Sequence, residues 1–150
     1  MTNVAQTPPA WLDYFLRPVL NECVPNEIAA LLEVARSALI YGIFFYPLVT
    51  LGSEQCYRIL EAGVRLRCDQ LAIPTKTVTK SGRERPTRFD ENLDALLASG
   101  CVLQASREQW DAVRRLRNSA SHPSSQMILD PGQAQGQLEL TVNFLNDLFK

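Results

Sequence analysis

The stretch SEQCYRILEAGVRLRCDQL, residues 53–71, decides the fold class, because its apolar residues recur at the spacing of one helical face. Charged residues one helical turn apart, such as Glu61 and Arg65, lie on the opposite side. The pattern therefore predicts a long amphipathic helix that packs on a core. The apolar face consists of Cys56, Leu60, Val64, Cys68 and Leu71.

Helical signals also flank this stretch on both sides. We expect an earlier helix to begin near Asn26 and to end at Tyr46–Pro47, because a residue before proline is pushed out of the helical region. After it, Gly100 is placed to end a short helix and Asp130 to cap the last one. The predicted helices are 26–46, 53–71, 90–99, one ending near 121, and one from 130 to the end of the sequence. The predicted fold class is therefore all-α, an antiparallel bundle of four to five helices.

A chain of 150 residues suits one domain. We divide it into an N-terminal arm, residues 1–25, and a helical bundle domain, residues 26–150, with a basic loop at 74–88. In the arm, Trp11 and Phe15 have helical spacing. They indicate either a turn of helix docked on the core or a contact for a partner, and we favour the docked helix.

Composition excludes several function classes. The most apolar stretch, Ala38–Leu51, is broken by Pro47 and is shorter than the about 20 residues of a membrane span, so we expect it in the core and expect no membrane partner. The four cysteines form no C-x-x-C pair and there is one histidine, so we expect neither a metal nor another cofactor. We expect a reducing, cytoplasmic location in which the cysteines stay free.

The net charge of −1 provides no global attraction to nucleic acid, so any such contact must come from a local basic patch. The loop at 74–88 is the best candidate. Thr77–Thr79 is a possible strand of a small hairpin with Ser81-Gly82 as its turn. The loop is either a mobile solvated connection or an electrostatic arm for phosphate. Against the single acid Glu84 it carries Lys76, Lys80, Arg83, Arg85 and Arg88.

The sharpest functional signal is the run Arg117-Asn118-Ser119-Ala120-Ser121-His122. On a helical wheel this helix turns Trp110, Val113, Leu116 and Ala120 to the core. The polar patch at its C-terminal end consists of Arg117, Asn118, Ser121 and His122. The helix dipole favours a charged imidazole and the nearby arginines oppose it, so we expect His122 to titrate near neutral pH, as proton transfer requires. The alternative is an ordinary polar helix face, with His122 capping free carbonyls.

The run Leu116–Ser124, LRNSASHPS, resembles the signature of the HEPN superfamily, in which an arginine and a polar residue are followed a few residues later by histidine. Its position near the end of the penultimate helix, the stretch Tyr57–Ala62 and the break at Gly100 are also similar to HEPN-like domains associated with restriction and phage-defence systems. The resemblance covers roughly residues 26–149. The basic loop and the N-terminal arm depart from the family pattern.

The resemblance implies an HEPN-like bundle and metal-independent cleavage of RNA, as a toxin or defence effector. His122 would act as base or acid, Arg117 would hold the phosphate, and Asn118 would orient either of them. One histidine per chain would require a homodimer with facing motifs, and a toxin would have an antitoxin or other protein partner. The residues expected to bind substrate are Ser121, Arg114, Arg115, Lys76, Lys80, Arg83 and Arg85. The alternatives are a catalytically inactive module that binds a nucleotide, RNA or a protein, and a helical adaptor without a nucleic-acid role.

Overall fold

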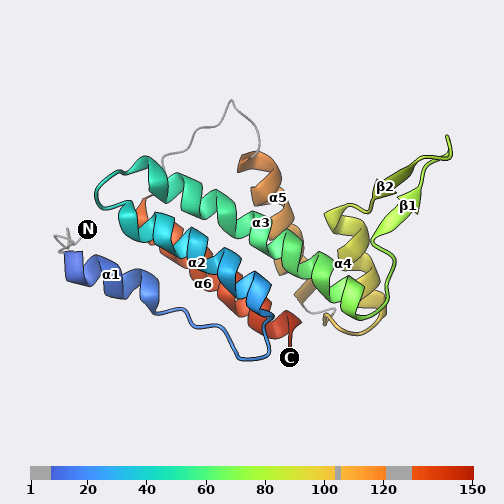
Figure 1. The fold of residues 1–150 in the computed structure, drawn as a ribbon, viewed down its shortest axis with the longest axis horizontal. Coiled ribbons are helices and arrows are strands. Elements are labelled where there is room, and N and C mark those ends of the chain that lie inside the picture. The colour runs from blue at the N-terminus through green and yellow to red at the C-terminus, as the bar shows by residue number, and fades with distance from the viewer. Residues whose placement is uncertain (1–7, 104–105, 121–129) are drawn as a thin grey trace.

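A computed structural model of the chain describes residues 8–103, 106–120 and 130–150, and over residues 117–120 it describes the helical backbone alone. These parts form an all-α helical bundle with one small hairpin, which confirms the predicted fold class (Figure 1). In chain order the elements are α1 (Pro8–Leu16), α2 (Asn26–Tyr41), α3 (Pro47–Gln70), β1 (Lys76–Val78), β2 (Glu84–Pro86), α4 (Phe89–Ala98), α5 (Arg107–Ala120) and α6 (Pro131–Leu148).

The helices α2, α3 and α6 lie side by side and form the body of the molecule (Figure 1). The central helix is α3, in which Cys56, Leu60, Val64 and Cys68 of the predicted apolar face are buried, whereas Leu71 follows the end of the helix and is exposed. It approaches α6 closely at Gly63, where an added Cβ would lie 2.8 Å from Cδ2 of Leu145. The core between these helices contains fully buried leucines, among them Leu32, Leu39, Leu60, Leu138 and Leu145.

The N-terminal helix α1 is docked on α2 and α6, as we favoured from the spacing of its aromatic residues. Trp11 and Phe15 are buried, with ring centroids 5.2 Å apart. The Trp11 indole N–H donates a hydrogen bond to the Leu39 carbonyl at 3.0 Å, which satisfies its polar atom inside the core. Arg36 of α2 also donates to the Pro18 carbonyl at 2.7 Å and holds the connection that follows α1.

The boundary between the first two predicted helices is wrong by several residues. Helix α2 ends at Tyr41 rather than at Tyr46, and α3 begins at Pro47 rather than near Ser53. The reason is that Pro47 occupies the first helical position, where its missing N–H leaves no hydrogen bond unmade. The chain turns at Gly42, where an added Cβ would lie 2.5 Å from Cγ2 of Val49, so only glycine allows this approach.

The expectation that Ala38–Leu51 is core is correct for only part of the stretch. Leu39 and Val49 are fully buried and Ile40 and Ile43 pack against the core, but five other large side chains near the turn are exposed. Phe44 is 79% exposed and Phe45 is 60% exposed. We call this exposed group the aromatic corner, and it comprises Tyr41, Phe44, Phe45, Tyr46 and Leu51. A turn between two helices buries only the side chains that face the other helices. Hydrophobicity alone does not reveal which side chains these are.

The remaining elements agree more closely with their sequence signals. Gly100 has a φ of +76° directly after α4, as expected of a glycine that ends a helix. The Asp130 carboxylate accepts hydrogen bonds from the backbone N–H groups of Gly132 and Gln133 and so caps α6, as predicted. The strands β1 and β2 form the antiparallel hairpin that the Thr77–Thr79 pattern suggested.

Candidate nucleic-acid interface

The motif run begins on the last turn of α5. Arg117 and Asn118 belong to this turn, since the helical backbone extends to Ala120. Their side chains lie outside the described part of the structure, and Ser121 and His122 lie outside the described residues altogether. The convergence of these four side chains on one phosphate therefore stays a prediction.

Helix α5 is held against the body by a few apolar contacts near its N-terminal half. Trp110 is buried, and its ring lies 4.4 Å from that of Phe144 on α6 and 6.1 Å from that of Phe89 on α4, measured between centroids. Val113, one turn further on, is also buried. Leu116 is 53% exposed, so the prediction that it faces the core is wrong. Among the described side chains of α5, the buried apolar residues therefore end at Val113.

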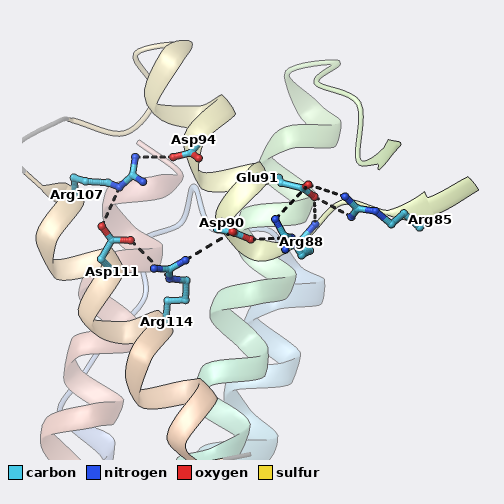
Figure 2. Close-up of polar contacts among 8 residues, drawn as sticks. All are labelled: Arg85, Arg88, Asp90, Glu91, Asp94, Arg107, Asp111 and Arg114. Carbon is cyan, nitrogen blue, oxygen red and sulfur yellow. Dashed lines mark hydrogen bonds and ion pairs between the residues drawn. The ribbon is translucent and has the colours of Figure 1, made fainter. Parts of the chain in front are cut away.

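Ion pairs join α5 to α4 (Figure 2). The Arg107 guanidinium lies 2.6 Å from an Asp94 carboxylate oxygen and 3.1 Å from one of Asp111. Arg114, which we expected to bind substrate, lies 3.7 Å from Asp90 and 3.8 Å from Asp111. Its guanidinium therefore lies near two carboxylates, one of them on α4, at distances longer than a hydrogen bond, and its buried Nε has no hydrogen-bond partner.

A second set of contacts joins the hairpin to α4 (Figure 2). Arg85 donates to both carboxylate oxygens of Glu91, at 2.7 and 3.0 Å, and the Arg88 backbone N–H donates to Glu91 at 2.7 Å. These hydrogen bonds, the one from Arg85 first, lower the pKa of Glu91 from its ordinary 4.5 to about 2. The hydrogen bond to Glu91 likewise raises the pKa of Arg85. Arg85 is thus a structural anchor of the hairpin in this conformation.

The acids at the start of α4 have the structural role that their position at a helix N-terminus predicts. Asp90, Glu91 and Asp94 each contact an arginine of the hairpin, of α5 or of the helix start. Across residues 8–103, 106–120 and 130–150, no three His, Cys, Asp or Glu side chains form a group that could hold a metal ion.

The other cations that we expected to bind substrate differ in whether an acidic side chain pairs with them. Lys76 lies 3.8 Å from Glu84, and both side chains are 72% exposed. Lys80, Arg83 and Arg115 are exposed, and no side chain of the described residues forms an ion pair with any of them. The sequence revealed all these cations but did not reveal which of them pair with an acid. The acids at 90, 91 and 94 were a usable signal, since they directly follow the loop.

A hollow of about 440 Å³ lies at the far end of α3, beside the one arginine that the helical wheel places within the apolar face. Arg67 lines it, donates from Nε to the Cys101 sulfur at 3.2 Å and from Nη1 to the Gln70 side chain at 3.1 Å, and lies over the Phe149 ring. An arginine in the last turn of a helix balances the partial negative charge of the terminal carbonyls. This explains why a charge is tolerated next to the apolar face of α3.

The buried cysteines are chemically quiet. Cys56 and Cys68 are fully buried, as their place on the apolar face of α3 predicts. Burial raises the pKa of the Cys56 thiol to about 12 and that of Cys68 to about 11. Both therefore remain protonated at neutral pH and serve as small core residues.

Comparisons with known protein families, with characterised proteins and with solved structures find no match to this chain. No helix among the described residues is long and apolar enough to cross a membrane. The fold class is thus established by the structure itself, and the function has to be argued from the residues.

Proposed function

We propose that this protein is a metal-independent endoribonuclease of HEPN type that acts as a toxin or defence effector. The observation that carries the proposal is the run Arg117–His122 itself, which starts in the last turn of a helix that is anchored near its other end. A cationic group and an imidazole at such a projecting end would be open to a large, flexible substrate.

The proposed reaction uses the 2′-hydroxyl of RNA as the nucleophile. This oxygen attacks the neighbouring phosphorus, the 5′-oxygen of the next nucleotide leaves, and the products carry a 2′,3′-cyclic phosphate and a 5′-hydroxyl. His122 takes the proton from the 2′-hydroxyl or gives one to the leaving oxygen. Arg117 holds the non-bridging oxygens, and Asn118 orients the imidazole or the phosphate. Exposed Arg115 adds positive charge beside them.

A homodimer belongs to the same proposal, because one histidine per chain does not readily supply both a base and an acid. Two copies with facing motifs provide two histidines, one for each proton transfer. As a toxin, the protein would be controlled by a protein antitoxin that covers the motif.

The test is cleavage of mixed RNA by the purified protein in EDTA. We expect the His122→Ala and Arg117→Ala variants to lose about 10²–10⁴-fold in rate. Arg58→Ala is the matched control, because Arg58 is an exposed arginine on α3, and it should cleave at the wild-type rate. Intact RNA with wild-type protein across several substrates would reject the enzyme. Products without a cyclic-phosphate end would reject the mechanism.

The second candidate is a catalytically inactive module that binds a nucleotide, RNA or a protein, and the aromatic corner is the observation that favours it. Exposed aromatic side chains gathered at one turn are typical of a protein-binding surface. A second copy is the partner we expect there, because Ser37–Ser53 contains no charged residue and two copies meeting there would bury no charge.

Light scattering separates the two candidates when it is read beside the cleavage assay. The binding module predicts a dimer that the double variant Phe44→Ser/Phe45→Ser converts to a monomer, whereas the nuclease predicts a dimer through the motifs that these substitutions leave intact. A dimer of this kind that leaves RNA intact favours the binding module. A wild-type protein that is monomeric at all concentrations contradicts the dimer in both candidates.

A further inference from the structure

The hairpin β1–β2 projects away from the helical bundle at the end where α4 lies (Figure 1). Its turn, residues 79–83, is closed by backbone hydrogen bonds from Thr79 N–H to the Arg83 carbonyl at 2.8 Å and from Gly82 N–H to the Thr79 carbonyl at 2.9 Å. The Thr79 hydroxyl also accepts from the Arg83 N–H at 3.2 Å. Gly82 has a φ of +76°, which glycine adopts without strain. The turn is therefore a defined structure.

The base of the hairpin is held on both sides. The bidentate pair between Arg85 and Glu91 joins it to α4 (Figure 2). On the other strand, the Thr75 hydroxyl donates to Asp69 near the end of α3 at 2.8 Å, and the Thr87 N–H donates to the Thr75 carbonyl at 2.9 Å. The hairpin is thus carried as an arm by two helices, which holds its end away from the body.

The positive charge of this arm is concentrated at its end. Glu84, which pairs with Val78 next to the turn, lies within 3.8 Å of Lys76, and Glu91 binds Arg85, so two of the basic residues below the turn are paired with acids. Lys80 and Arg83 flank Ser81-Gly82, are exposed, and have no ion-pair partner within the described ranges. We call residues 80–83 the hairpin tip. It offers two cations and a hydroxyl on a protein whose net charge is −1.

We propose that the hairpin tip binds the phosphodiester backbone of RNA, and this rests on the proposed function because the RNA is the substrate cleaved at the motif. Phosphate groups are recognised through Lys and Arg without regard to sequence, so a short cationic projection suits them. A lipid surface shares the phosphate chemistry, but membrane-binding segments add large apolar side chains that insert. The tip has none, and Val78 is the nearest exposed apolar residue.

The experiment measures the affinity for a labelled single-stranded RNA as a function of salt concentration, in EDTA and in the His122→Ala background, so that no cleavage occurs. The double variant Lys80→Gln/Arg83→Gln removes the two cations of the tip. If each contacts one phosphate, the slope of log K against log salt becomes shallower by about 1.4, and the affinity at low salt falls on the order of tenfold. The control Arg58→Gln/Arg65→Gln removes two exposed arginines of α3, and therefore the same amount of charge, and should keep the parental slope.

An unchanged slope in the Lys80→Gln/Arg83→Gln variant overturns the inference, and so does a parent protein that binds no RNA. Binding to vesicles of phosphatidylcholine with phosphatidylserine, lost in the same variant while RNA binding persists, also overturns it in favour of a membrane. Failure of the proposed function gives a different result. In that case the protein with His122 intact leaves RNA whole, while the slope still depends on Lys80 and Arg83.

Discussion

Two regions of this molecule are held together by different forces. The body of α2, α3 and α6 is held by apolar side chains in close contact, with helices that touch at Gly63. The side formed by the hairpin, α4 and α5 also has buried apolar residues, Leu93 and Leu96 on α4 and Trp110 and Val113 on α5, and charged pairs join α4 to α5 and to the hairpin (Figure 2). The body depends on apolar packing, and the other side depends on charge in addition to apolar packing.

This difference bears on function because the motif run begins on the charge-dependent side. Apolar burial contributes roughly 25 cal/mol per Å², whereas an exposed ion pair contributes about 0–1 kcal/mol and weakens in salt. We therefore expect the end of α5 to open locally more often than the body does. Such freedom suits a site that has to admit RNA and to meet a partner.

The largest difference in stability should come from shortening one leucine to alanine in each of the two regions. Leu145 is fully buried in the body, so Leu145→Ala should lower the free energy of unfolding by about 2–5 kcal/mol. Leu116, near the end of α5, is 53% exposed. Leu116→Ala should therefore change the free energy of unfolding by less than about 0.5 kcal/mol. Chemical denaturation of both variants measures this. Similar losses in the two would show that α5 is packed as tightly as the body.

An intermediate effect should come from two glycines with open space around them. Gly100 joins α4 to the segment before α5 with a φ of +76°, so Gly100→Ala should destabilise by about 1–2 kcal/mol through backbone strain alone. Gly136 is an exposed residue inside α6, and Gly136→Ala should stabilise by about 0.5–1 kcal/mol. Thermal unfolding checks both. If both variants changed the free energy of unfolding in the same direction, the proposed difference between Gly100 and Gly136 would be wrong.

The smallest effect should be a pH dependence confined to the charge-dependent side. The folded protein lowers the pKa of Glu91 from 4.5 to about 2, chiefly through Arg85. The resulting stability is present above about pH 4.5 and is lost as the pH falls toward 2. Wild type should therefore be more stable than Glu91→Gln at neutral pH, and the difference should vanish across this window.

Arg85→Gln should reproduce most of this pH dependence, and the double variant should lose less than the sum of the two single variants, because Glu91 keeps its hydrogen bond from the Arg88 N–H when Arg85 is removed. Unfolding by denaturant at a series of pH values provides the measurement. A difference between wild type and Glu91→Gln that persists at pH 2 would show that it does not arise from ionisation.

Part of the candidate site was readable from the sequence. The cations at 76–88 and 114–117 are visible as residue types, and the Thr77–Thr79 pattern predicted the hairpin. Which cations are free could not be predicted, because pairing depends on distances between α4, α5 and the hairpin. Arg114 and Arg85 form ion pairs with carboxylates, whereas Lys80 and Arg83 form none with the described residues.

By itself the sequence determined the helical class, the buried face of α3, the cap at Asp130 and the glycine that ends α4. These follow from spacing and from local backbone chemistry, which act within a few residues. The tertiary structure alone decided where α2 turns into α3, which aromatic side chains remain exposed there, and which arginines are neutralised. Those outcomes depend on how the helices and the hairpin are placed relative to one another in space, and residue spacing along one element does not specify that placement.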